Sequence, residues 1–386
     1  MYMPVKRVNY LIVGGGLTAV AAVDGIREHD AAGSIAVVSA EPYKPYRRPW
    51  LSKKLWSGGD EEKLWVETGE AELVLGRRMV SLSPDSSRAV DDAGDEYEYD
   101  KLLIATGGTP RRLGGDDGDV VYFRTFDDYR RLRERAPEGS KAIMIGGGFI
   151  GSEIAAALTM NGVEVTMVFP EPAINFRLLP RDLADFVTAY YRDKGVEVLA
   201  EETVSEVTGT SVTLGSGRVL EGDAVVAGLG IVPDTTLADG LTLDNGIVVD
   251  EYGRVEGSER IYAAGDVANF PSPVLGRRFR VEHEDHAKSH GRVVGANMAG
   301  ANERYDHLPF FYSDLFELGY EAVGEVDSRL ETVAEWQEPF RKGIVTYVDE
   351  QRRPRGFLLW DVWGKVDEAR ERIRAGDPVG EGALLA

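Results

Sequence analysis

Two stretches of the chain repeat one pattern: NYLIVGGGLTAVAAV at residues 9–23 and KAIMIGGGFIGSEIAAAL at residues 141–158. Each consists of an apolar run, a cluster of glycines and an alanine-rich stretch typical of a helix. A second apolar run follows each copy, at residues 34–39 and 163–169. This order predicts two strand–helix–strand units with parallel strands. We therefore expect an α/β fold built on two such units.

The glycines of both copies have the spacing that a dinucleotide requires. The spacing is G-x-G-x-x-A in the first copy and G-x-G-x-x-G in the second, at Gly14, Gly16 and Ala19, and at Gly146, Gly148 and Gly151. The first glycine makes a sharp turn, the second lets the backbone approach a pyrophosphate, and the third position must be small so that helix and strand can pack. The phosphates then meet the N-terminus of the helix. One copy alone would fit an ordinary α/β turn, whereas two together predict two dinucleotide-binding domains.

An acidic residue near the end of the second strand often binds the ribose in such units. Glu41 follows the first copy and Glu171 the second, although either could be an exposed loop carboxylate. Three more segments, at residues 99–111, 224–234 and 259–270, read as strands that end in glycine turns. They supply further candidate cofactor-binding residues: Thr106, Gly107, Arg111, Gly230 and Gly265.

Composition excludes several classes of function. The chain has 386 residues, a formal net charge of -21 and no cysteine. Such acidity opposes binding to nucleic acid, because that binding depends on neutralising phosphates; it suits solubility or docking of a basic partner. Without cysteine there is no disulfide, thiolate nucleophile or Cys-ligated cluster in this chain. Redox chemistry would therefore belong to a bound organic cofactor.

The chain shows no targeting or membrane signal. The first predicted strand begins near Asn9, which leaves no room for a signal peptide. No apolar run reaches the ~18 residues that a membrane-spanning helix needs. We therefore expect a soluble, cytoplasmic protein with no membrane span.

Three histidines on one predicted helix raise the question of a metal site. They are His283, His286 and His290, and the string HEDH is not the H-E-x-x-H motif of zinc enzymes. We expect no metal, and we interpret His286 and His290 as surface or helix-end residues.

Four regions carry a resemblance to a known family. They are KPYRRPWLSKKLW at 44–56, LLIATGGTPR at 102–111, GGGFIGSE at 146–153 running into EVTMVFPEPAINFRLLP at 164–180, and RVEHEDHAKSHGRVVGANM at 280–298 followed by FFYSDLFELGYEAVGEVDS at 310–328. The chain resembles the FAD-dependent pyridine-nucleotide oxidoreductases of the ferredoxin-reductase type. Within that group it is most similar to the oxidoreductase core of apoptosis-inducing factor.

The resemblance implies two Rossmann-like (glutathione-reductase-like) dinucleotide-binding domains and a C-terminal α+β domain. The FAD-binding domain would use residues 1–113 and 237–306. The NAD(P)H-binding domain would occupy residues 114–236 and would be entered through the acidic, glycine-rich residues 114–119. The C-terminal domain, residues 307–386, would cover the flavin, help to form the acceptor side and take part in a homodimer.

The resemblance also implies roles for single residues. Lys53 and Glu153 would meet near the reactive nitrogen of the flavin, and Phe149 would stand where the nicotinamide enters, so these three are the candidate catalytic residues. Glu171 would bind the adenosine ribose of NADH. The other implied FAD contacts are Gly14, Gly16 and Arg48 at the pyrophosphate, Asp266 at the ribityl chain, Glu282 and His283 at the far end of the flavin, and Tyr312 beside it.

Three positions depart from the pattern of that family. The usual acidic ribose ligand on the FAD side falls at Ala40, so Glu41 would have to replace it. Trp50 stands where the family has a second proline, and Tyr312 stands where it commonly has Trp. The last two changes would affect the approach of an acceptor.

The predicted function is transfer of a hydride from NADH to FAD, and then of electrons to an external acceptor such as a small iron–sulfur protein, a quinone or oxygen. NADPH is the less favoured donor because Glu171 would repel its 2′-phosphate, although Arg177 could reach that phosphate. The alternative that the resemblance implies is a redox-gated interaction protein. In that role NADH would form a long-lived charge-transfer complex, reoxidation would be slow and the association state would change.

Overall fold

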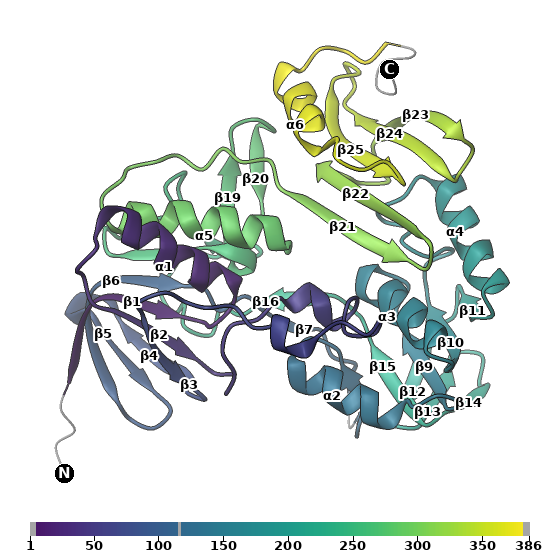
Figure 1. Ribbon diagram of the computed structural model, residues 1–386, viewed down its shortest axis with the longest axis horizontal. Helices are drawn as coiled ribbons and strands as arrows, with labels where there is room; N and C mark the ends of the chain where they lie inside the picture. Colours follow the sequence, from purple (N-terminus) through teal and green to yellow (C-terminus); the bar gives the residue numbers. More distant parts are fainter. Residues whose placement is uncertain (1–4, 115–116, 381–386) are drawn as a thin grey trace. The chain divides into compact units, whose positions relative to one another are not determined.

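The computed structural model describes residues 5–114 and 117–380. The chain divides into two compact units, Met1–Arg47, Glu61–Thr109 and Val232–Pro309 in the first, and Arg48–Asp60, Pro110–Ile231 and Phe310–Ala386 in the second. Residues 48–60 are therefore a short excursion of the chain into the second unit. Figure 1 shows the elements of both units.

The first unit is built on a mainly parallel sheet with the order β3-β2-β1-β6-β5-β4, and β18 pairs with β6. Its strands are β1 (Lys6–Val13), β2 (Ile35–Ser39), β3 (Glu72–Leu75), β4 (Met79–Ser83), β5 (Arg88–Asp91), β6 (Glu96–Ile104) and β18 (Ile261–Ala263). Leu11 and Ile12 of β1 belong to different hydrophobic clusters, one on each face of the sheet. Both faces of the sheet are covered at β1, which explains why apolar residues follow one another along this strand without alternating with polar ones.

Two helices of the first unit lie side by side over one face of this sheet (Figure 1). They are α1 (Leu17–His29) and α5 (Glu284–Met298). Their backbones approach closely, because a Cβ atom at Gly291 would lie 2.4 Å from the Thr18 carbonyl oxygen and one at Gly295 would lie 2.1 Å from that of Ala22. The glycines of α5 thus allow this helix to pack closely against α1, the helix that follows the first glycine loop.

Short elements complete the first unit. They are the 3-10 helices η2 (Glu61–Lys63), η3 (Pro84–Ser86) and η4 (Gly265–Val267), and a small sheet of β17 (Ile247–Val248), β19 (Ala268–Ser272) and β20 (Arg277–Phe279). The chain passes from unit to unit through β7 (Gly108–Pro110) and β16 (Ile231–Pro233).

The second unit contains a parallel sheet with the order β11-β10-β9-β15-β8. Its strands are β8 (Val121–Tyr122), β9 (Lys141–Ile145), β10 (Glu164–Phe169), β11 (Glu197–Ala200) and β15 (Ala224–Ala227), and its helices are α2 (Phe126–Arg135), α3 (Phe149–Met160) and α4 (Arg181–Asp193). A capping box between Thr125 and Asp128 starts α2. A small antiparallel sheet of β12 (Val204–Val207), β13 (Ser211–Leu214) and β14 (Val219–Glu221) is also present.

The C-terminal part of the second unit is an antiparallel sheet with the order β21-β22-β25-β24-β23. Its strands are β21 (Phe310–Leu315), β22 (Leu318–Gly324), β23 (Glu331–Glu338), β24 (Lys342–Val348) and β25 (Pro354–Trp360). Helix α6 (Val366–Ala375) packs against β22 and β25. The segment 48–60 contributes the 3-10 helix η1 (Arg48–Leu51).

The architecture is the predicted one: an α/β fold with two strand–helix–strand units of parallel strands and a C-terminal α+β part. The predicted entry segment, 114–119, contains residues 115 and 116, which lie outside the described residues. Within the described ranges, no helix is both long and apolar enough to cross a membrane.

Candidate functional site

The first glycine loop leaves room in front of a helix. Gly14 has φ +116°, and a Cβ atom there would lie 2.2 Å from the Ala105 carbonyl oxygen, so only glycine fits this turn. Gly16 is the N-cap of α1, has no side-chain cap, and a Cβ atom there would meet nothing within 4 Å. The first N–H groups of a helix lack intrahelical acceptors. An open space before such a terminus fits a pyrophosphate.

The second glycine loop has the same geometry in the other unit. Gly146 has φ +113°, and a Cβ atom there would lie 2.5 Å from the Gly228 carbonyl oxygen. Gly148 is the N-cap of α3, again without a side-chain cap and with nothing within 4 Å of an added Cβ. At Gly151 an added Cβ would lie 2.0 Å from the Gly146 carbonyl oxygen, so the third position must be small. Each unit therefore offers one phosphate cradle.

Alanine at the second glycine of each loop should separate folding from binding. Gly16 and Gly148 have φ -88° and -85°, which alanine adopts without strain. Gly16→Ala should therefore keep or slightly raise the melting temperature of the apoprotein but lose bound FAD, because the methyl group enters the cradle. Gly148→Ala should retain FAD and raise the KM for NADH.

The control for this pair is Gly14→Ala, which should lower both stability and FAD content because its backbone cannot relax. The measurements are flavin absorbance after gel filtration, thermal unfolding and steady-state kinetics. Full FAD retention by Gly16→Ala would contradict the assignment of the first cradle.

Several candidate FAD contacts lie in the first unit, in three places. These are the helix and strand of the first strand–helix–strand unit, the segment that follows β6, and the start of α5. Ala19 is buried in α1, and Glu41 accepts a hydrogen bond of 2.6 Å from the Tyr46 hydroxyl. The hydroxyl of Thr106 donates to the Asp234 carbonyl oxygen at 2.6 Å, next to Gly107, which has φ +69°.

The third place is the start of α5, together with η4, which packs against this helix. Gly265 and Asp266 are the first two residues of η4, and His283 is the N-cap of α5.

Arg280 connects residues at this third place, and sequence reasoning did not single it out. Its side chain is 8% exposed, pairs with Glu282 at 2.6 Å and donates to the Asp266 carbonyl oxygen at 3.3 Å. A buried guanidinium that holds both a candidate carboxylate and the backbone of another candidate fixes their positions. The sequence signal for this role is that Arg280 lies two residues before Glu282, which is a candidate FAD contact.

The histidines of α5 are buried, so the surface interpretation of His286 and His290 is wrong. Both are 0% exposed. His290 Nδ1 accepts a hydrogen bond of 3.3 Å from the Gly265 N–H, and His286 Nδ1 lies 2.9 Å from the Tyr305 hydroxyl. Burial lowers the pKa of His290 to about 3. Among the described residues, no group of three His, Asp or Glu side chains is placed to hold a metal.

The buried His290 should make the protein sensitive to acid. An unfolded histidine binds a proton near pH 6.5, whereas the folded pKa of His290 is about 3. The unfolded state therefore binds more protons between these values, so the free energy of unfolding should fall as pH drops from about 6.5 towards 3, by at most ~1.4 kcal/mol per pH unit for this group. His290→Gln should flatten the slope measured by urea unfolding at a series of pH values.

Phe270→Leu is the control for this measurement, because the Phe270 ring packs on His290 but does not titrate. It should lower stability at every pH and keep most of the slope, because both histidines remain in the folded core. An unchanged slope in His290→Gln would show that other groups cause the acid sensitivity.

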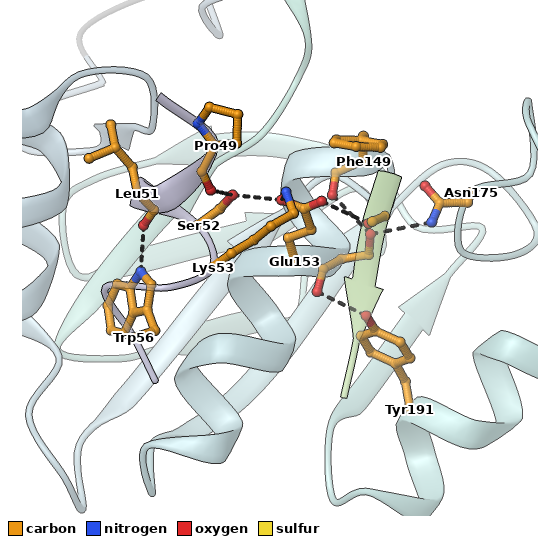
Figure 2. Close-up of polar contacts among 11 residues, drawn as sticks. Pro49, Leu51, Ser52, Lys53, Trp56, Phe149, Glu153, Asn175 and Tyr191 are labelled. Carbon is orange, nitrogen blue, oxygen red and sulfur yellow. Dashed lines mark hydrogen bonds and ion pairs between the residues drawn. The ribbon is translucent and has the colours of Figure 1, made fainter. Parts of the chain in front are cut away.

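The second unit brings together the three candidate catalytic residues (Figure 2). Lys53 Nζ lies 2.6 Å from Glu153 Oε2, and their side chains are 7% and 0% exposed. The same ammonium lies 5.4 Å from the centre of the Phe149 ring and 5.2 Å from that of Tyr312. The two charges are separated by 100 residues in sequence, so the fold alone creates this pair.

Two serines complete the surroundings of Glu153 and were not predicted. Ser52 Oγ donates to Glu153 Oε2 at 2.6 Å, and Ser313 Oγ donates to Oε1 at 2.7 Å. A buried carboxylate is costly unless its oxygens are paired and hydrogen-bonded. Lys53 and the two serines meet this requirement from two different segments of the chain.

Tryptophan and helix contacts hold the excursion 48–60 in place. Trp56 Nε1 donates to the Leu51 carbonyl oxygen at 2.7 Å, and its ring packs edge-on against Tyr129 of α2 at 5.6 Å. Asn161, just after α3, donates to the Trp56 carbonyl oxygen at 3.1 Å. Trp50, the unusual residue of this segment, has Lys54 Nζ 4.7 Å from its ring centre. The contacts of Trp56 fix the backbone from which Lys53 projects.

Three other candidates of the second unit have partners outside the Lys53–Glu153 pair. Arg48 donates to the Arg124 carbonyl oxygen at 2.7 Å, and the Arg111 N–H donates to the Gly230 carbonyl oxygen at 2.9 Å. Glu171 follows β10 and pairs with Arg177 at 2.8 Å.

Comparisons with known proteins show the family to which the chain belongs. The model of the pyridine nucleotide-disulphide oxidoreductase family matches residues 8–291, and that of the mitochondrion-associated C-terminal part of apoptosis-inducing factor matches residues 294–339. Apoptosis-inducing factor 1 of Dictyostelium discoideum is 32% identical over 96% of this chain and 79% of its own length. Peroxisomal monodehydroascorbate reductase 1 of Arabidopsis thaliana is 36% identical over 84% of this chain and 83% of its own.

A solved structure is similar over nearly the same length. In the covalent putidaredoxin reductase–putidaredoxin complex, one chain superimposes with a TM-score of 0.89 at 27% identity, covering 96% of this chain and 94% of that one. The resemblance stated from the sequence is thus confirmed. The chain belongs to the pyridine nucleotide-disulphide oxidoreductase family and is an FAD-dependent NAD(P)H oxidoreductase.

Proposed function

We propose that the protein oxidises NADH in preference to NADPH and delivers the electrons directly to an external acceptor, for which a small iron–sulfur protein or a quinone is the first candidate. The observation that carries this proposal is the absence of cysteine from a chain whose family is named for disulphide chemistry. No dithiol of this chain can receive the electrons, so they must leave from the cofactor itself. The similarity to a reductase solved together with its partner putidaredoxin supports a protein acceptor.

The two phosphate cradles would hold the two dinucleotides, with FAD on the loop at Gly16 and NADH on the loop at Gly148. FAD supplies the chemistry of accepting a hydride and releasing electrons, while the protein supplies binding, orientation and exclusion of water. Lys53 and Glu153 present a fixed pair of opposite charges at a dry position beside Phe149. We assign to this pair and to the Phe149 ring the placement of the nicotinamide.

The preference for NADH rests on Glu171. Its carboxylate suits the hydrogen bonds of a ribose hydroxyl and opposes a 2′-phosphate. Arg177, which could favour the phosphate, is engaged with Glu171 at 2.8 Å. We also keep a homodimer and a cytoplasmic location as proposals; two of the relatives are named as mitochondrial and peroxisomal proteins.

The test of this function is NADH oxidation with a panel of acceptors. Purified protein should release FAD and not FMN on denaturation, because both cradles suit pyrophosphates. Turnover with ferricyanide, a soluble quinone, a [2Fe–2S] ferredoxin and the monodehydroascorbate radical should then be compared. Fast turnover with a one-electron acceptor supports the reductase, and recovery of FMN alone would refute the cofactor assignment.

A second candidate function is a redox-gated interaction protein, favoured by the match to the C-terminal part of apoptosis-inducing factor at residues 294–339. In that case NADH binding would change the association state, and reoxidation by air would be slow. Anaerobic titration with NADH followed by air, observed by absorbance and light scattering, separates the two. Rapid reoxidation without a change in scattering excludes the switch.

A further inference from the structure

The two oxygens of the Glu153 carboxylate are held by different parts of the second unit. Oε2 accepts hydrogen bonds from Lys53 Nζ and Ser52 Oγ, both at 2.6 Å, and these residues are neighbours in the excursion 48–60. Oε1 accepts one from Ser313 Oγ at 2.7 Å, and Ser313 belongs to the C-terminal sheet. The hydrogen bonds to the carboxylate are therefore unequal, with two donors on one oxygen and one on the other.

Ser313 is held more firmly than a loop residue would be. It is fully buried in β21 and stands directly opposite Tyr320 of β22. The Tyr320 ring is in turn stacked on Trp360 of β25, with the ring centres 5.6 Å apart. The backbone that carries the Ser313 hydroxyl is thus part of a packed sheet, so its direction towards Glu153 is set by that sheet.

The surroundings of Glu153 strengthen each of these hydrogen bonds. Burial, and after it the negative charge of Glu153, raise the pKa of both Tyr191 and Tyr320 well above the ordinary value of a tyrosine. The carboxylate therefore acts on neighbours that water does not screen. In such a medium a hydrogen bond to a charged group is strong, and a buried oxygen without a donor is costly.

We propose that Ser313 is a positioning residue of the hydride-transfer site: its hydroxyl fixes Glu153 Oε1 so that Oε2 remains on Lys53. Without this donor the carboxylate would turn to satisfy Oε1 elsewhere, and the pair with Lys53 would lose its geometry. Ser52 adds a second donor to an oxygen that Lys53 already holds, so its loss would matter less. This inference rests on the proposed role of the Lys53–Glu153 pair.

The experiment compares Ser313→Ala with Ser52→Ala by stopped-flow reduction of the bound flavin by NADH. Ser313→Ala should lower the limiting rate constant roughly 10- to 100-fold, the size expected for a lost hydrogen bond to a charged group. Its Kd for NADH should change by less than about threefold, because the serine acts only through Glu153. Ser52→Ala should lower the rate constant by about threefold. Ser57→Ala changes an exposed serine of the same segment and should match the parent.

Two further variants distinguish positioning from a general loss of structure. Ser313→Thr keeps a hydroxyl and should recover most of the rate. Adding Ser313→Ala to Glu153→Gln should slow reduction by less than about twofold beyond Glu153→Gln alone, since the residue through which Ser313 acts is then changed. Urea unfolding without FAD gives a second readout, measured on the parent, Ser313→Ala, Glu153→Gln and the double variant. The losses in the free energy of unfolding caused by Ser313→Ala and Glu153→Gln should be non-additive.

Each result decides the proposal. A rate constant for Ser313→Ala equal to that of the parent overturns it, and so does an equal loss in Ser313→Ala and Ser52→Ala. Should Ser313→Ala fail to fold, Ser313→Cys takes its place, because a thiol fills similar space and is a weak donor. A parent protein that NADH does not reduce would sink the proposed function instead, which is a separate outcome.

Discussion

Lys53→Met is expected to slow the reduction of bound FAD by NADH roughly 100-fold, the cost typical of a displaced group at a reacting centre. The methionine keeps the length of the side chain but removes the ammonium that lies 2.6 Å from Glu153 Oε2. Glu153 then remains buried with two serines as its partners. Breaking a buried ion pair costs about 3–5 kcal/mol, so the melting temperature should also fall.

The neighbouring lysine gives a matched control for this variant. Lys54 is exposed and lies over the Trp50 ring, so Lys54→Met makes the same chemical change outside the pair. It should leave the rate of flavin reduction unchanged. Lys53→Met combined with Glu153→Gln should recover part of the lost stability, because no buried charge is then unpaired. Strictly additive losses would show that the two side chains act independently.

Glu171→Gln is expected to raise the ratio of kcat/KM for NADPH to that for NADH by roughly 10- to 100-fold, in line with hydrogen bonds to charged groups. The substitution removes a negative charge from the proposed ribose site. It also releases Arg177, which is 87% exposed and pairs with Glu171 at 2.8 Å. A free guanidinium would then bind the 2′-phosphate.

The contribution of Arg177 is measured by adding Arg177→Ala to Glu171→Gln, which should remove most of the gain with NADPH. Glu164→Gln is the control, because Glu164 is an exposed carboxylate at the other end of β10, paired with Lys141. It should leave the ratio unchanged. A parent protein that prefers NADPH would show instead that Arg177 already dominates the site.

The sequence predicted the glycine loops well because their physics is local. The signal lies within a short window that contains a strand, three closely spaced small residues and the first turn of a helix. Gly14 and Gly146 have the positive φ that such turns require and that glycine adopts freely. The family resemblance paired Lys53 with Glu153, which spacing alone could not do. The structure places the two side chains in contact, and their catalytic role stays a prediction.

Ser52 and Ser313 were missed because their importance is not local, whereas Arg280 pairs with Glu282 only two residues away. Ser313 contacts a residue 160 positions away, and a serine in a strand has no pattern that announces such a partner. The burial of His286 and His290 is different, because a signal was present. Both lie on the helical face that also carries the buried Val293, Val294 and Asn297, at spacings of three and four residues.

The three donors to Glu153 also bear on how the protein acquires activity as it folds. They belong to two segments of the chain and lie 101, 100 and 160 residues from Glu153. Contacts between such distant segments form slowly, because loop closure precedes any stabilising gain. During refolding from urea with FAD present, we therefore expect reduction of the flavin by NADH to appear only when β21 has docked on α3.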